Sequence, residues 1–457
     1  MNISITDLVE TQKAAHRKGT TLSLKARTDL LKRLRMMVSK HEKELCDAIA
    51  ADFGKPYVES YVTEIFTVLQ EIDFHLKHLK KWMKPESAGT HVSVFPAKSE
   101  IHYRPYGTVL VISTWNYPVH ISLMPVIGAL SAGNTVVLKP SELAAHTSAV
   151  LKKLIDEYFR NQIFSVVEGS VKETRELLSQ PFDKIFFTGS SRVGKIVMKA
   201  AAEQLIPVSL ELGGKSPAIV HSDADLEIAT RRIWWGKTIN AGQTCVAPDY
   251  VLIHKNLKQD FIQKSRVVLS SFYEDDYRTG ENFARIINGD HFDRLAEMLH
   301  NSDVLFGGNL NSESLFIEPT LIDADWSDEI MQEEIFGPLL PVLTYSDPDE
   351  VIERVRSLPA PLALYLFTNS DAIQEKIFSG IPFGGGCLNE TINHLANPHL
   401  PFGGIGNSGM GSYHGIHSFK AFSHEQSIVK KQSWPDPDIR YPPYDQEKLK
   451  WVKKLFS

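Results

Sequence analysis

The chain is poor in cysteine and has little excess charge. Only 3 of its 457 residues are cysteines, and such an odd, sparse set makes a disulfide framework improbable and suits a reducing compartment. The 49 basic and 55 acidic residues leave a formal net charge of −6, which gives no long-range attraction to nucleic acid or to anionic lipid. We therefore expect no nucleic-acid partner.

Signals for export and for membrane insertion are also missing. Residues 1–10 contain neither the basic region nor the apolar region of a secretory signal. No apolar run approaches the roughly 20 residues that a membrane-spanning helix requires. These absences predict a cytoplasmic protein. The content of 43 % hydrophobic and 23 % charged residues is typical of globular proteins, and the length fits two or three domains.

The first hundred residues predict helices and then a hairpin. Apolar residues recur at helical spacing over 26–49 and over 61–79, which indicates two long amphipathic helices. The polar segment 84–104 follows, and short alternating stretches within it, such as 91–95, indicate exposed strands. We expect this segment to form a hairpin that projects from the body.

Beyond that segment, short apolar strands alternate with helix-length segments. The expected strands are 108–113, 135–138, 164–167, 184–188 and 208–210 in a first series, and 217–220, 250–254, 339–343 and 363–367 in a second. This alternation is typical of βαβ units. It predicts an α/β protein with parallel sheets in two successive domains.

A glycine turn follows the expected strand 184–188. It reads Gly189-Ser190-Ser191-Arg192-Val193-Gly194-Lys195 and opens a helix, a geometry that directs free backbone N–H groups at an anion. The spacing resembles a P-loop, but Ile196 stands where that motif needs a hydroxyl for magnesium, so nucleotide hydrolysis is disfavoured. The turn is not a G-x-G-x-x-G fingerprint either. By itself it fits dinucleotide binding and an ordinary structural turn equally well.

Polar side chains follow two other expected strands. Asn116 comes just past 108–113, where open α/β sheets bind ligands; it could donate to an oxyanion or simply close an Asx-turn. Lys139 follows 135–138 and fits either a contact to ribose hydroxyls or a solvated loop lysine. Glu142 is equally compatible with the carboxylate of a helix cap that begins at Ser141.

Two carboxylates and one thiol complete the candidate set. Cys245 stands among small residues, and Glu211 stands upstream as a possible base, a combination that suggests covalent chemistry. An isolated cysteine is more often a buried, inert thiol. Glu334 and Phe336 precede a rigid Gly-Pro turn, and Glu334 taken alone fits a surface charge at a helix end.

Six segments in this order resemble the aldehyde dehydrogenase superfamily over nearly the whole chain. They are Trp115-Asn116-Tyr117-Pro118, Lys139-Pro140-Ser141-Glu142, Phe187-Thr188-Gly189-Ser190, Leu210-Glu211-Leu212-Gly213-Gly214-Lys215, Gly242-Gln243-Thr244-Cys245 and Glu334-Ile335-Phe336-Gly337-Pro338. The segments 247–250 and 408–415 look like the class 3 branch, which implies a homodimer and tolerance of NAD or NADP.

The resemblance implies a role for each candidate residue. Cys245 would attack an aldehyde as a thiolate, and the Asn116 amide with the Cys245 backbone N–H would hold the oxyanion. Glu211 would activate the water that hydrolyses the thioester after hydride transfer. The implied cofactor site contains no metal; its residues are Trp115, Lys139, Glu142, Gly189, Ser190, Val193, Gly194, Glu334 and Phe336.

The resemblance also implies a domain plan. A Rossmann-like NAD(P)-binding domain would span 1–83 and 105–210, and a second, catalytic α/β domain would span 211–411. A small β oligomerisation element would combine 84–104 with 412–433, ahead of a tail over 434–457. In that tail Leu449, Val452 and Phe456 share one helical face among four lysines, so it could dock on the body, on a partner subunit or, more weakly, on anionic lipid.

Two rival readings stay open at this point. In a CoA-acylating dehydrogenase the thioester would pass to a thiol instead of water, although Glu211 favours hydrolysis. A cofactor-binding protein without turnover would have no need of Asn116, Glu211 and Cys245 together. The preference between NAD and NADP is open too, because Glu142 should repel a 2′-phosphate.

Overall fold

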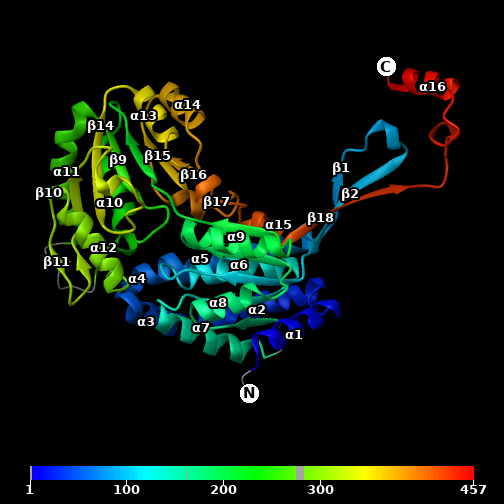
Figure 1. Cartoon of the computed structure of the whole chain (residues 1–457), viewed down its shortest axis with the longest axis horizontal. Coiled ribbons are helices and arrows are strands. Elements are labelled where there is room, and N and C mark those ends of the chain that lie inside the picture. Colours follow the sequence, from blue (N-terminus) through cyan, green and yellow to red (C-terminus); the bar gives the residue numbers. More distant parts are fainter. Residues whose placement is uncertain (1–2, 161, 274–281, 457) are drawn as a thin grey trace.

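The computed structural model describes residues 3–160, 162–273 and 282–456. Figure 1 shows two layered α/β lobes, one built from the first half of the chain and one from the second, and an arm that leaves them and ends at the C-terminus. Within the described residues, no helix is long and apolar enough to cross a membrane.

The chain opens with more helices than the sequence predicted. They are α1 (Ile5–Arg17), α2 (Leu24–Lys40), α3 (Glu42–Phe53), α4 (Tyr57–Ser60), the π-helix η1 (Tyr61–Phe66) and α5 (Thr67–Trp82). The expected helix over 26–49 is broken at His41, whose backbone leaves the helical region at φ −113° and ψ 22°. Helix α1 escaped prediction because it buries Gln12, which donates to the Val136 carbonyl, beside only two apolar side chains.

The first lobe contains a six-stranded sheet in the order β17-β7-β6-β3-β4-β5. Its strands are β3 (Thr108–Ile112), β4 (Thr135–Lys139), β5 (Phe164–Val166), β6 (Lys184–Thr188), β7 (Val208–Glu211) and β17 (Gly409–Met410). All pairs are parallel except the one that adds β17, and helices α6 (His120–Ala132), α7 (Ala145–Tyr158), α8 (Val171–Leu178) and α9 (Ser191–Glu203) connect the strands. The predicted Rossmann-like arrangement is confirmed.

This strand order fixes where a ligand can bind. From β3 the chain proceeds outward through β4 and β5, and then returns to the other side of β3 to add β6 and β7. The loops after β3 and β6 therefore diverge and leave a crevice at the carboxyl edge of the sheet. Asn116 and Gly189 lie in these two loops.

The second lobe contains a seven-stranded sheet in the order β10-β13-β14-β9-β8-β15-β16, parallel except for β10. Its strands are β8 (Pro217–Val220), β9 (Tyr250–His254), β10 (Asp303–Phe306), β13 (Thr320–Asp323), β14 (Leu339–Tyr345), β15 (Ala363–Phe367) and β16 (Gly385–Leu388). Around it lie α10 (Leu226–Thr238), α11 (Lys258–Tyr273), α12 (Gly289–His300), α13 (Pro348–Arg356) and α14 (Asp371–Gly380). The four strands predicted here are confirmed, whereas β10, β13 and β16 were missed.

The arm is a three-stranded antiparallel sheet with a helical end. Strand β2 (Ala97–Pro105) pairs with β1 (Glu86–Ala88) and, over its whole length, with β18 (Ser423–Lys431). The hairpin is thus confirmed, but the strand expected at 91–95 is wrong. The short 3-10 helix η2 (Val92–Val94) occupies that position, because His91 caps it through the Ser93 N–H.

The tail lies beyond the arm. After the turn η9 (Asp438–Arg440), α16 (Gln446–Phe456) confirms the predicted tail helix. It stands away from both lobes of its own chain in Figure 1, which removes the chain's own body from the docking surfaces that we predicted. Leu449 and Val452 are exposed on it, and the side chain of Phe456 lies outside the described residues.

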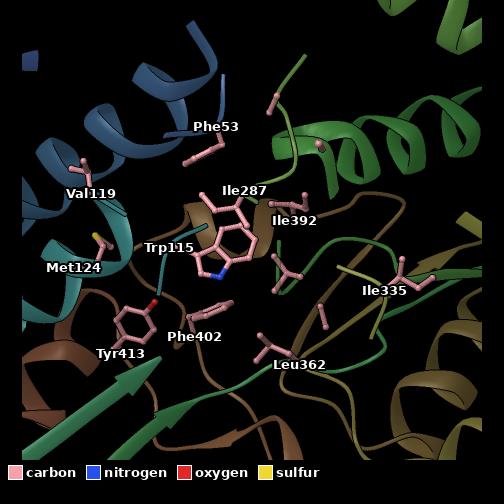
Figure 2. Packing of buried hydrophobic residues seen from close by; sticks show 14 of the residues in the cluster. Phe53, Trp115, Val119, Met124, Ile287, Ile335, Leu362, Ile392, Phe402 and Tyr413 are labelled. Atoms are coloured by element: carbon pink, nitrogen blue, oxygen red, sulfur yellow. The ribbon is translucent and has the colours of Figure 1, made fainter. Parts of the chain in front are cut away.

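One apolar core joins the two lobes. Figure 2 shows Trp115, from the loop after β3, among buried side chains that include Phe53, Ile287, Phe402 and Tyr413. These residues come from distant parts of the sequence and belong to a single packed cluster. The loop that carries Asn116 is therefore held by packing from both lobes.

Candidate active site

A cleft of about 630 Å³ lies where the two lobes meet. Eight of the predicted site residues line it: Trp115, Asn116, Gly189, Ser190, Glu211, Cys245, Glu334 and Phe336. The first and the last of these residues, Trp115 and Phe336, are more than two hundred positions apart in the chain. The fold therefore brings most of the predicted set together. Four predicted cofactor residues, Lys139, Glu142, Val193 and Gly194, are not in its lining.

The loop before Cys245 has an unusual backbone. Helix α10 ends at Thr238, and the turn η3 (Ile239–Gly242) places Asn240 and Ala241 at φ values of 53° and 51°. Gly242 follows at φ 74°, and a side chain there would collide with the carbonyl of Gly337. Such conformations persist only where the surroundings enforce them, and they cluster at functional sites.

Asn116 forms hydrogen bonds with this loop through both its side chain and its backbone carbonyl. Its side-chain nitrogen donates to the Gln243 carbonyl at 3.0 Å, and the Asn240 side chain donates to the Asn116 carbonyl at 2.7 Å. The side-chain oxygen of Asn116 is buried without a hydrogen-bond partner among the described residues. The alternative of a local Asx-turn is wrong, because the amide reaches across to a segment 127 residues away.

The environment of Cys245 favours the protonated form of its thiol. Burial, followed by the negative charges of Glu334 and Glu211, raises its pKa to about 12. The backbone N–H groups of Cys245 and Val246 oppose this, since they can donate to a thiolate. The sulfur thus lies beside backbone N–H donors, which could also donate to the oxygen of a substrate bound next to the sulfur.

Glu211 is a buried carboxyl group without partners. It ends β7, is 3 % exposed, and neither carboxyl oxygen has a hydrogen-bond partner among the described residues. Burial alone raises its pKa well above the ordinary carboxyl value. A carboxylate with a raised pKa accepts a proton readily, which is the property required of a general base near neutral pH.

Glu334 and Phe336 form the opposite wall. The Glu334 carboxyl group lies against Gly213, accepts from the Gly214 N–H, and has its pKa raised to about 8 by burial and then by Asp249. The interpretation of Glu334 as a surface charge at a helix end is therefore wrong. Phe336 contacts the Trp115 ring edge-on, with 5.5 Å between centroids.

The far end of the cleft fits an anion. Helix α9 begins there, and its N-cap Ser190 accepts from the Val193 N–H, so other N–H groups of the first turn remain available. The hydroxyl of Thr188 is buried without a partner among the described residues, and Arg192 and Lys195 also line the cleft. These groups fit the diphosphate of a dinucleotide.

Three of the residues outside the lining have contacts within the first lobe. Lys139 is buried and donates to the Pro140 carbonyl at 2.7 Å and to Glu142 at 2.9 Å. Gly194 lies against Leu212, where a side chain would collide. Glu142 is not a helix-cap carboxylate, because α7 begins only at Ala145 and its N-cap makes no side-chain hydrogen bond.

Sequence reasoning missed two residues of α12. The His291 ring lies 5.1 Å from that of Trp115, and Arg294 donates to the Ile335 carbonyl at 2.6 Å, which braces the segment that carries Glu334. Both residues line the cleft. Helix α12 has an ordinary amphipathic pattern, so nothing in its sequence marked these positions.

Comparison with known proteins points to one family. The family model described as the aldehyde dehydrogenase family matches residues 4–428. The chain is 47 % identical to aldehyde dehydrogenase family 3 member H1 of Arabidopsis thaliana, over 96 % of this chain and 92 % of the relative. It is 43 % identical to the dimeric NADP-preferring aldehyde dehydrogenase of Rattus norvegicus, over 96 % of this chain and 98 % of the relative.

A solved structure gives the same result. The substrate-bound state of Staphylococcus aureus AldH matches with a TM-score of 0.97 and 43 % identity, and the match covers 100 % of both chains. The family model spans most of the sequence, and the relatives span nearly all of it. The chain therefore belongs to the aldehyde dehydrogenase family, in which it is similar to the class 3 members.

Proposed function

We propose that Cys245, Asn116 and Glu211 carry out the reaction of this enzyme, the NAD(P)-dependent oxidation of an aldehyde to a carboxylic acid. The observation that supports this most strongly is the hydrogen bond from the Asn116 side chain to Gln243, which joins Asn116 to the loop of Cys245. The same cleft contains the carboxyl group of Glu211, which has no hydrogen-bond partner among the described residues. The three groups match a nucleophile, an oxyanion donor and a base.

The first step is the addition of sulfur to the carbonyl. An aldehyde carbon is trigonal and releases a hydride only after it becomes tetrahedral, which a thiolate achieves by forming a carbon–sulfur bond. The carbonyl electron pair moves to oxygen, where the Asn116 amide and the Cys245 N–H can donate to it. Because the pKa of Cys245 is about 12 here, its proton must pass to water before or during the attack.

The second step frees the acid. NAD or NADP, when bound, would supply the oxidant for the hydride that leaves the substrate carbon. The thioester left on Cys245 then needs water, and Glu211 takes the proton of that water as oxygen attacks the carbonyl carbon. The carbon–sulfur bond breaks, the sulfur leaves as a thiolate, and the carboxylic acid departs.

The cleft offers groups that could bind two parts of the cofactor, the diphosphate and the nicotinamide riboside. Thr188 at the end of β6 and the N-cap Ser190 of α9 would bind the diphosphate, with Arg192 and Lys195 as neighbouring cations. Glu334 and Phe336 stand beside Cys245 for the nicotinamide ribose and ring. Lys139 and Glu142, which pair with each other outside the cleft lining, remain our proposal for the adenosine ribose.

We further propose a homodimer joined through the arm, in a reducing compartment such as the cytoplasm. The arm sheet projects from the lobes and leaves an open edge at β1, a surface that a second copy can cover (Figure 1). The rat relative is named as dimeric. All three cysteines are free, which suits a reducing compartment.

One substitution tests the chemistry. Cys245→Ser should abolish aldehyde-dependent reduction of NAD and NADP, while titration by fluorescence should show dinucleotide binding close to that of the unmodified enzyme. The same assay with and without coenzyme A identifies the acyl acceptor. Undiminished turnover by the serine variant would remove Cys245 from the mechanism.

A further inference from the structure

A fully buried ion pair lies behind the oxyanion residues. The Lys55 Nζ lies 2.9 Å from a carboxyl oxygen of Glu64, and both side chains are 0 % exposed. Lys55 comes two residues after α3, and Glu64 belongs to the π-helix η1. Burial removes the hydration of both charges, and this cost offsets much of their attraction, so the pair is weak evidence for stability. Its role is better explained by the neighbouring segments that it holds in position.

Lys55 contacts the residue next to Asn116. Its Nζ lies 4.0 Å from the centre of the Tyr117 ring, a dry position in which the attraction between cation and ring is strong. The Tyr117 hydroxyl in turn lies 2.6 Å from the Thr244 hydroxyl. Thr244 directly precedes Cys245, so one ring connects the buried cation with the loop of the nucleophile.

Glu64 holds the other end of the same loop. Its second carboxyl oxygen accepts from the Val119 N–H at 2.9 Å and from the His120 N–H at 3.4 Å. These N–H groups lie at the start of α6, and the N-cap Val119 has no side chain that could cap it. The carboxylate complements the positive end of the helix and fixes where the helix begins.

The two contacts bracket the oxyanion amide. Asn116 immediately precedes Tyr117, and α6 begins four residues after Asn116. Lys55 contacts the Tyr117 ring on one side of Asn116, and Glu64 accepts from the Val119 N–H on the other. The Asn116 side-chain amide itself donates to the carbonyl of Gln243. A chain of contacts therefore runs from the buried pair to the loop of the amide and to the segment that carries the sulfur.

We propose that Lys55 and Glu64 are positioning residues for the oxyanion site. They hold Tyr117 and the start of α6, and through these the Asn116 amide and the Thr244–Cys245 segment, at the separation that the transition state requires. The inference rests on the roles proposed above for Asn116 and Cys245. A displacement of about 1 Å in such a site costs on the order of a hundredfold in rate, even when it begins far from the reacting atoms.

The test removes both charges together. The variant Lys55→Met/Glu64→Gln removes both partners of the ion pair together, so neither is left buried without the other, and we expect it to fold and to bind NAD within about twofold of the unmodified enzyme. Its kcat should fall at least about tenfold, with a KM for aldehyde that changes much less, because the oxyanion contact strengthens only in the transition state. The matched control is Lys43→Met/Asp47→Asn, an exposed pair on α3, which should leave kcat unchanged.

A milder variant covers the case in which the double variant does not fold. Tyr117→Phe keeps the ring against Lys55 but removes the bond to Thr244, and we expect a similar selective loss of kcat. Where both fold, combining them should give less than the product of the separate losses, because they act through one contact chain. Full kcat in either variant, or strictly multiplicative losses, would overturn the inference.

The outcome separates this inference from the proposed function. If the unmodified enzyme oxidises aldehydes, Cys245→Ser does not, and Lys55→Met/Glu64→Gln keeps full kcat, only the positioning role fails. If Cys245→Ser retains turnover, the assignment of the nucleophile fails, and the positioning role fails with it.

Discussion

The side-chain nitrogen of Asn116 donates to the main-chain carbonyl of Gln243 at 3.0 Å. This bond joins the loop after β3 to the strained loop that presents Cys245, so the residues that we propose as oxyanion donor and nucleophile are held together although they come from different lobes.

Replacing the side-chain amide of Asn116 should lower kcat strongly. In Asn116→Ala the donor to the oxyanion is lost, and we expect kcat to fall by about 10²–10³, the range observed for single oxyanion donors. Steady-state kinetics with saturating aldehyde and cofactor measures this. Asn256→Ala, at an exposed asparagine, is the control and should have normal kcat. A loss confined to KM would show that Asn116 only binds the substrate.

The raised pKa of Glu211 predicts a pH dependence of stability. The folded carboxyl group holds its proton at pH values where the unfolded one has already lost it. Stability therefore falls as pH rises above the unfolded pKa of 4.5. Glu211→Gln should be the more stable protein at pH 7, and the difference should shrink toward pH 4. Thermal unfolding across this range, with Glu203→Gln as an exposed control, checks the sign.

The same variant separates the two chemical steps. Glu211→Gln keeps the sulfur and the Asn116 amide, so one equivalent of NADH should still form rapidly. Hydrolysis of the thioester should slow by about 10²–10⁴, the usual contribution of a general base. Rapid mixing should show a burst of NADH followed by slow turnover. A variant without a burst would place Glu211 in the first step instead.

The influence of Glu334 on Cys245 can be measured by alkylation. A negative charge on Glu334 raises the pKa of the thiol, and Glu334 itself ionises only near pH 8, the value to which burial raises its pKa. Glu334→Gln should therefore react faster with iodoacetamide than the unmodified protein above pH 8, and at a similar rate at pH 6. Equal rates at pH 9.5 would contradict the coupling. Cys245→Ser gives the background from the other two cysteines.

Much of this architecture could be predicted because its signals are local. The buried strands β3, β4, β6 and β15 each contain at least three consecutive apolar residues, and short apolar runs between helix-length segments indicate a parallel sheet. The candidates Cys245, Glu211 and Asn116 likewise stand in short motifs, and the fold brings all three to one cleft. These features need no knowledge of what lies across the fold.

What could not be predicted depends on contacts between distant segments. The pairing of Lys55 with Glu64 has meaning only once Tyr117 and α6 lie against it, and the function of Arg294 depends on a carbonyl 41 residues away. Strand β10 was missed because it lies at the edge of its sheet, where Asp303 and Val304 are exposed and the apolar signal is weak. Sequence periodicity does not record such relationships.

Gly242 should be the least replaceable glycine of the site. It has φ 74°, and a methyl group would meet the Gly337 carbonyl, so Gly242→Ala combines a left-handed backbone, which costs about 1–2 kcal/mol, with a collision. We expect a lower melting temperature and at least a hundredfold loss of kcat, since the loop of Cys245 must shift. Gly289→Ala is the matched control, because nothing lies within 4 Å of its added carbon.

The tail helix should not bind lipid by itself. Leu449 and Val452 are exposed on α16, but a single short basic helix rarely anchors a protein, and Lys448 is engaged by Asp438 at 3.2 Å and by the Tyr441 carbonyl. Co-sedimentation with anionic vesicles should recover the full chain and a chain ending at Pro443 equally in the supernatant. Pelleting of the full chain alone, lost at high salt, would instead assign α16 to the membrane surface, since screening weakens exposed charge contacts.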